Sequence, residues 1–222
     1  MFSADKSFGR LLVPVLLLSG VAHLEAQPAP AGEIQQALSK LNELGAVLMI
    51  AAHPDDERTG VLAYFARGRH MRTAYLSVTR GEGGQNLIGS EQGAQLGIIR
   101  TQELLAARKI DGAEQFFTRA IDFGYSRTAA ETLEKWGHDR ILSDIVWVIR
   151  SYRPDVVMLV FSGTPSDGHG QHQVSAILSK EAFEAAADAH RFPEQLKYVQ
   201  PWRALRLVRA LFFGPPGRAR PW

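Results

Sequence analysis

AVLMIAAHPDDE, residues 46–57, is the stretch of sequence that decides the fold. Its first seven residues form a continuous apolar run, which is typical of a strand buried on both faces of a parallel sheet. The run ends at His53, and an acidic cluster follows at once. The stretch therefore predicts a central strand that presents ionisable side chains at its carboxyl end.

Strands and helices are expected to alternate along the rest of the chain. Short apolar runs indicate strands, and apolar residues at helical spacing indicate helices. We expect further strands at residues 73–78, 113–117 and 155–161, helices at 34–44, 60–69, 91–108, 139–152 and 173–190, and a polar loop at 119–136. This alternation predicts an α/β fold with a mostly parallel sheet.

Three polar segments follow three of the expected strands, at residues 53–57, 79–86 and 162–172. The carboxyl ends of parallel strands meet at one edge of a sheet, and ligands bind beyond that edge. We therefore expect the three segments to converge on a single site.

Histidines and carboxylates in two of these segments are candidate metal ligands. His53 and Asp56 follow the first strand, and His169 and His172 follow a later one. Two histidines and one carboxylate make a familiar zinc site that leaves one position open, and Asp55 could take a proton from zinc-bound water. The plainer interpretation is two helix starts, because acidic residues stabilise the first turn of a helix.

The segment from Arg80 to Asn86 contains three glycines, which let a backbone approach a ligand closely. It is not a dinucleotide-binding GxGxxG pattern, because Asn86 stands where the last glycine belongs, and it is not a phosphate-binding P-loop. We expect a substrate-facing loop in which Arg80, Glu82 and Asn86 contact sugar hydroxyls or a phosphate. The alternative is a mobile surface turn.

Four motifs together resemble the LmbE/PIG-L deacetylase family. They are AHPDDE at 52–57, Gly-Glu-x-Gly at 81–84, Arg-x-x-Glu at 100–103 and His-x-x-His at 169–172, and the resemblance covers about residues 45–190. It implies a Rossmann-like three-layer sandwich that hydrolyses N-acetyl groups on glucosamine-containing substrates. For Arg100 and Glu103, an ion pair on a helix is the alternative interpretation.

The resemblance also implies a role for each matching residue. His53, Asp56 and His172 match the zinc ligands, and Asp55 matches the general base. His169 matches a histidine that stabilises the oxyanion or protonates the leaving amine. Glu57 is interpreted as supporting a ligand or capping a helix.

The predicted activity is therefore removal of the N-acetyl group from an N-acetylglucosamine-containing small molecule or oligosaccharide. Two alternatives stay open. One is a zinc amidase that acts on a larger amide conjugate, and the other is a catalytically silent glycan-binding protein of the same fold. A His/His/Asp set also accepts divalent metals other than zinc.

Composition narrows the possible partners. The chain has no cysteine, which excludes disulfides and thiolate metal sites. Residues 27–190 carry 16 positive and 20 negative side chains, whereas residues 191–222 carry 7 positive and 1 negative. Nucleic-acid binding would need a basic patch on the folded domain, so no nucleic-acid partner is expected.

Both ends of the chain differ from the predicted domain at 45–190. Residues 1–26 are predicted to be a signal peptide, with a basic start, an apolar run too short for a membrane span and a cleavage position at Ala26. We therefore expect export to the periplasm or secretion, with an uncleaved membrane anchor as the alternative. Residues 27–44 are expected to form a linker and a leading helix.

Residues 191–222 are expected to form a basic tail. Apolar residues alternate there with arginines, as in Leu205-Arg206 and Val208-Arg209. We interpret this pattern as a basic amphipathic helix that contacts a membrane surface. A helix packed on the domain is the alternative.

Overall fold

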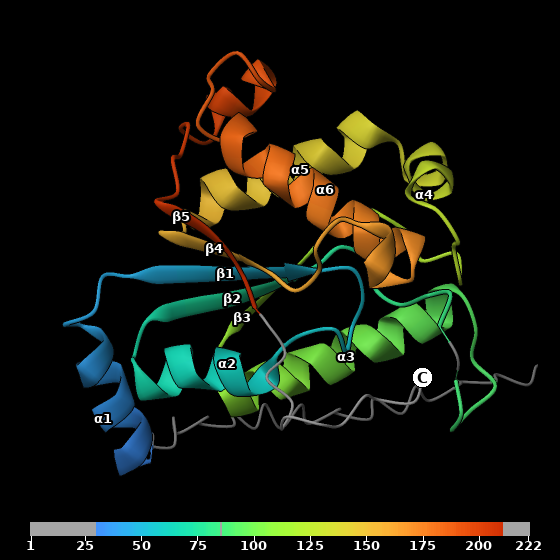
Figure 1. Cartoon of the computed structure of the whole chain (residues 1–222). Helices are drawn as coiled ribbons and strands as arrows, with labels where there is room; N and C mark the ends of the chain where they lie inside the picture. The colour runs from blue at the N-terminus through green and yellow to red at the C-terminus, as the bar shows by residue number, and fades with distance from the viewer. Residues whose placement is uncertain (1–29, 85, 211–222) are drawn as a thin grey trace, which may run out of the picture.

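The computed structural model describes residues 30–84 and 86–210, and these form one five-stranded sheet (Figure 1). The strand order is β3-β2-β1-β4-β5, and every neighbouring pair is parallel. The strands are β1 (Ala46–Ala51), β2 (Arg72–Ser77), β3 (Glu114–Phe117), β4 (Val156–Leu159) and β5 (Arg206–Arg209). The predicted α/β fold with a parallel sheet is confirmed.

Helices cover both faces of this sheet, which gives three layers (Figure 1). The α-helices are α1 (Ala31–Lys40), α2 (Thr59–Ala63), α3 (Ala94–Asp111), α4 (Ala129–Trp136), α5 (His138–Tyr152) and α6 (Gly170–Ala185). A π-helix, Tyr64–Gly68, continues α2, and two 3₁₀ helices lie at Pro165–Asp167 and Pro193–Lys197.

Alternate residues of β1 enter two separate cores. Leu48 and Ile50 belong to the core shared with α5 and α6, whereas Met49 and Ala51 belong to the core shared with α2 and α3. Side chains alternate between the two faces of a strand, so a central strand needs apolar residues at every position. This explains why the run at 46–52 has no polar residue.

The order of the strands fixes where a ligand can bind. From β1 the chain proceeds outward through β2 and β3, and it then returns to place β4 on the other side of β1. Such a reversal leaves a crevice beyond the carboxyl ends of the two central strands. His53 and Asp56 lie in the loop after β1, and His172 lies in the first turn of α6, which follows β4, so the candidate metal ligands open into this crevice.

The segment at 119–136, which we expected to be a polar loop, contains a helix. Helix α4 begins after Thr128, whose side chain accepts a hydrogen bond from the backbone N–H of Glu131. Thr-x-x-Glu is the capping-box pattern, so the signal was present in the sequence. Trp136 at the end of α4 is buried and donates its indole N–H to Ile121.

The expected amphipathic helix in the basic tail is wrong for the described residues. That segment instead contains β5, which pairs with β4 and extends the sheet beyond residue 190. Leu207 packs against the core, and Arg206 on the same strand is exposed. Backbone pairing with the open edge of β4 outweighs the local apolar spacing, because strand formation depends on tertiary context.

The predicted signal peptide and the last residues of the tail lie outside the described part of the chain. Within residues 30–84 and 86–210, no helix combines the length and the apolar character needed to cross a membrane. The leading helix expected at 34–44 is α1, which has no buried residue.

Candidate metal and active site

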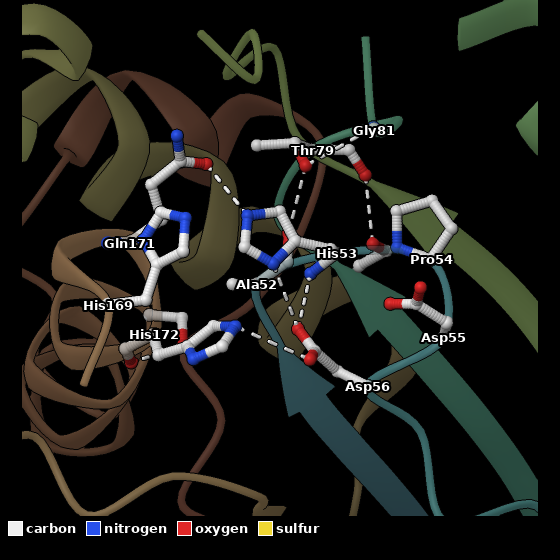
Figure 2. A network of polar contacts seen from close by, with 12 residues as sticks. Ala52, His53, Pro54, Asp55, Asp56, Thr79, Gly81, His169, Gln171 and His172 are labelled. Atoms are coloured by element: carbon white, nitrogen blue, oxygen red, sulfur yellow. Dashed lines mark hydrogen bonds and ion pairs between the residues drawn. The ribbon is translucent and has the colours of Figure 1, made fainter. Parts of the chain in front are cut away.

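His53, Asp56 and His172 come together beyond the carboxyl ends of β1 and β4 (Figure 2). One candidate ligand atom from each lies within 4.8 Å of the others. Nδ1 of His53 is 3.2 Å from one oxygen of Asp56, and Nε2 of His172 is 3.5 Å from the other. The Asp56 carboxylate therefore lies between two imidazoles that come from different strand ends.

The electrostatics of the three groups follow from this proximity. Burial disfavours the charged form of His53, but the hydrogen bond and charge of Asp56 outweigh it and raise the His53 pKa to about 9. Burial likewise opposes ionisation of Asp56, yet His53 and then His172 lower its pKa. Burial lowers the pKa of His172.

Gln171 determines which nitrogen of His53 faces Asp56. Its side-chain amide nitrogen donates to the Asp122 carboxylate at 3.1 Å and to the Gly124 carbonyl at 2.9 Å. Its amide oxygen must therefore face Nε2 of His53, 2.9 Å away, and accept a hydrogen bond from the N–H there. In neutral His53 the Nδ1 lone pair is then free for a ligand on the Asp56 side.

A similar arrangement orients His172. Its Nδ1 donates to the backbone carbonyl of Asp167 at 3.2 Å, and its ring stacks on Phe161 at 3.9 Å between centroids. The Asp167 carboxylate accepts hydrogen bonds from the backbone N–H groups of residues 162–164 and so fixes this loop. Nε2 of His172 is left to face Asp56.

The chemistry of these donors fits a divalent metal. Zinc sites of hydrolases commonly have three nitrogen or oxygen ligands and one open position, and their histidines donate the second ring N–H to an acceptor. His53 donates to Gln171, and His172 donates to Asp167. The three residues could therefore hold zinc or a similar ion without rearrangement of their partners.

Asp55 lies at the rim of this cluster. Its side chain is 72% exposed, and Arg100 donates to its carboxylate at 3.0 Å and to the Pro54 carbonyl at 2.7 Å. Partial burial and then repulsion by Asp56 raise the pKa of Asp55, and Arg100 opposes this rise. Nε of Arg100 is also 3.5 Å from a carboxylate oxygen of Glu103. Arg100 therefore makes the helix ion pair and the contact with Asp55 at the same time.

His169 is the N-cap residue of α6, and its ring lies 5.2 Å from His53 and 4.9 Å from His172. Its Nδ1 accepts the backbone N–H of Gln171 at 3.1 Å, so the proton of the neutral ring is on Nε2. Burial, followed by the charges of His53 and His172, lowers the pKa of His169 to about 4. His169 is therefore a neutral hydrogen-bond donor near pH 7.

These groups line a cavity of about 500 Å³. The glycine-rich loop contributes backbone to its wall at Gly81, Gly83 and Gly84. A side chain at Gly83 would require rearrangement, because its Cβ would overlap the backbone nitrogen of Gly124. Close contact between two loops thus shapes the cavity.

The three side chains that we expected to contact substrate make hydrogen bonds to other groups of the protein. Arg80 donates to the Thr118 carbonyl and lies over the Phe117 ring. Glu82 accepts the backbone N–H groups of residues 80 and 122. Asn86 binds the backbone of its own loop at residues 88, 89 and 91. They shape the loop, and its glycines line the cavity.

Sequence reasoning did not identify Asp122, Tyr125 or Gln171. Tyr125 lines the cavity with its ring 5.1 Å from that of His169, and its hydroxyl donates to the Gly168 carbonyl. Gln171 lies inside the His-x-x-His segment, so its position was a signal. Asp122 and Tyr125 belong to the segment that we expected to be a polar loop, and its sequence contains no pattern that points to them.

Comparison with known proteins agrees with the fold and the motifs. The family model PIG-L, described as GlcNAc-PI de-N-acetylase, matches residues 48–183. A 1D-myo-inositol 2-acetamido-2-deoxy-alpha-D-glucopyranoside deacetylase from Geodermatophilus obscurus is 32% identical over 67% of this chain and 56% of that protein. A mycothiol S-conjugate amidase from Streptomyces coelicolor is 26% identical over 77% of this chain and 62% of that protein.

The aligned part of this chain spans less than two thirds of the length of either relative. Among solved structures, the N,N'-diacetylchitobiose deacetylase from Pyrococcus horikoshii superimposes with a TM-score of 0.60 at 17% identity, over 82% of this chain and 70% of that one. A likeness at that identity shows the fold alone. Because the family model matches more than half of the sequence, the chain belongs to the PIG-L family.

Proposed function

We propose that this chain is a metal-dependent amide hydrolase that removes the acetyl group from an N-acetylglucosamine-containing substrate. One observation carries the proposal: three candidate metal ligands converge in a cavity that also holds a carboxylate and a neutral histidine. Relatives described as a deacetylase of an acetamido sugar and as an amidase support amide hydrolysis.

His53, Asp56 and His172 would hold the ion, and we propose zinc because two imidazoles and one carboxylate suit it. A bound ion of this kind polarises the amide carbonyl and makes water more acidic. Proton transfer and stabilisation of the oxyanion are then carried out by side chains of the cavity.

Asp55 is the proposed general base. It accepts a proton as water adds to the carbonyl carbon, and it returns that proton to the nitrogen as the C–N bond breaks. The products are acetate and a free amino sugar. Arg100 holds the carboxylate toward the cavity through its 3.0 Å contact, and a positioned base of this type contributes about 10²–10⁴-fold to a rate.

His169 is the proposed oxyanion donor. Its neutral ring carries the proton on Nε2, so it can donate to the oxygen of the tetrahedral intermediate. A neutral imidazole is a poor proton donor to an amine, and this leaves the protonation of the leaving group to Asp55. The two roles that the motif left open for His169, oxyanion stabilisation and amine protonation, are thus divided between two residues.

The cavity suits a small polar substrate. Its volume of about 500 Å³ accommodates a sugar, and its wall is formed by glycine backbone and by charged or aromatic side chains such as Asp122 and Tyr125. A second candidate, hydrolysis of a larger amide conjugate, is supported by the likeness to the mycothiol S-conjugate amidase.

The test is amine release by the zinc-loaded chain from N,N'-diacetylchitobiose, N-acetylglucosamine and amides with longer acyl groups. We expect turnover of the acetylated sugars and a loss of about 10²–10⁴-fold in Asp55→Asn with the metal retained. His172→Ala should lose the metal as well. Turnover of long acyl amides alone would favour the amidase, and metal-loaded protein that binds sugars without cleaving them would indicate a silent glycan-binding protein.

Export remains part of the proposal and rests on the sequence pattern of residues 1–26. The expected result is a mature N-terminus at Gln27 in protein recovered from outside the cytoplasm. Full-length protein that sediments with membranes would indicate an anchor instead.

A further inference from the structure

We propose that Glu57 and Arg108 are positioning residues that hold the backbone of Asp55 in the conformation from which its carboxylate reaches the cavity. The role assigned to Asp55 rests on the proposed function, whereas the support of its backbone is a property of the fold. Neither Glu57 nor Arg108 is among the described residues that line the cavity.

The backbone of Asp55 needs such support. Its φ angle is +99°, in a region that residues with a side chain rarely adopt. A strained backbone of this kind persists only where surrounding contacts impose it, and such residues gather at functional sites. The contacts that impose it here come from Glu57 and Arg108, whose side chains are almost fully buried.

Glu57 makes the first of these contacts. One oxygen of its carboxylate accepts the backbone N–H of Asp55 at 2.9 Å, and the other accepts Nη2 of Arg108 at 3.1 Å. The Glu57 side chain is only 5% exposed, so an unpaired carboxylate there would be costly. Arg108 therefore pairs with Glu57 and keeps its carboxylate aimed at the Asp55 amide.

Arg108 is itself fixed on all sides. Its side chain is 4% exposed, and Asp111 accepts its Nε at 3.0 Å and its Nη2 at 2.6 Å. Nη1 donates to the side chain of Gln115 on β3 at 3.1 Å. A planar guanidinium whose three nitrogens all donate to side chains is fixed in place, so the position of α3 is transmitted to Glu57.

Helix α3 thus holds the loop after β1 at two points. Arg100 and Arg108 are eight residues apart, which is about 12 Å along a helix. Arg100 binds the side chain of Asp55 from within the cavity, and Arg108 supports its backbone from outside the cavity through Glu57. Loss of Arg108 should therefore alter the placement of the base and leave substrate contacts in place.

The kinetic test compares Arg108→Met with Arg150→Met in the zinc-loaded chain. Arg150 is an equally buried arginine on α5, on the opposite face of the sheet from α3 (Figure 1), where it donates to the carbonyl groups of residues 185, 186 and 188. We expect Arg108→Met to lower kcat about 10–100-fold with one metal retained and KM nearly unchanged. Arg150→Met should lower Tm and keep the kcat of the folded fraction, and Arg108→Lys should recover part of the loss.

A second measurement does not depend on activity. Hydrogen exchange followed by NMR should show that the Asp55 amide exchanges faster in Arg108→Met than in the unaltered chain, while amides of β1 keep their protection. Should Arg108→Met fail to fold, Glu57→Gln keeps the volume and loses the ion pair, and the same selective change is expected.

The proposal is overturned if folded Arg108→Met keeps wild-type kcat and an unchanged Asp55 amide. It is also overturned if kcat, metal content and Tm fall in parallel in both arginine variants, because a general loss of folding stability would then explain the lower kcat. An unaltered chain that cleaves no amide defeats the proposed function only, and the exchange measurement still decides whether Glu57 and Arg108 hold Asp55.

Discussion

Metal uptake by this chain should release close to one proton. The structure gives each ligand a different protonation state in the metal-free chain. His53, with a pKa raised to about 9, carries a proton at neutral pH, whereas the lowered pKa of Asp56 and of His172 leaves both in the form that binds a metal. Only the His53 proton has to leave.

The pKa of His53 sets the sign and size of the pH dependence of metal affinity. Below pH 9 the metal competes with one proton for His53, so the apparent affinity should rise about tenfold per pH unit as the pH is raised. The folding stability of the metal-free chain should change in the opposite direction and fall as the pH is raised. Its His53–Asp56 pair stabilises the fold fully below pH 6.5, and that contribution is lost as the pH rises through about 9.

Isothermal titration calorimetry with zinc at pH 6.5, in buffers of different ionisation enthalpy, measures the number of protons released. His138→Gln is the control, because His138 pairs with Asp139 and Glu181 away from the site and its loss should leave the number unchanged. Release of less than about half a proton would mean that His53 is neutral before binding and would refute the reasoning. Release of two would show that His172 is protonated as well.

Four further substitutions test hydrogen bonds and packing, two of them at the site and two elsewhere in the fold. Gln171→Leu should weaken zinc binding about 10–100-fold, because the outer nitrogen of His53 loses its acceptor, and a competition assay with a chelating dye measures this loss. Gly83→Ala should lower the free energy of unfolding by about 1–3 kcal/mol in urea, since its methyl group would overlap a neighbouring backbone, whereas Gly60→Ala, in open space on α2, should raise it by about 0.5–1 kcal/mol. Arg150→Met should lower that free energy by about 3 kcal/mol, because several buried carbonyl groups lose their donor; a variant within about 0.5 kcal/mol of the unaltered chain would contradict this.

The sequence by itself determined the layers of the fold and the candidate residues of the site. A strand buried on both faces must be apolar at every position, so the run at 46–52 identified the central strand. Parallel strands end at one edge, and this placed His53 and His172 together although more than a hundred residues separate them. These inferences succeed because they depend on the apolar pattern of each segment and on the alternation of strands and helices, and both can be read along the chain.

Only the tertiary structure decided which neighbours hold those residues. The proton of His53 is placed by Gln171, the backbone of Asp55 by Glu57 and Arg108, and the cavity wall by glycines where we expected polar side chains. Residues 206–209 of the basic tail form an edge strand for the same reason, since an open sheet edge supplies hydrogen bonds that local spacing cannot reveal. Such contacts join residues distant in sequence, and their partners are fixed only when the chain has packed.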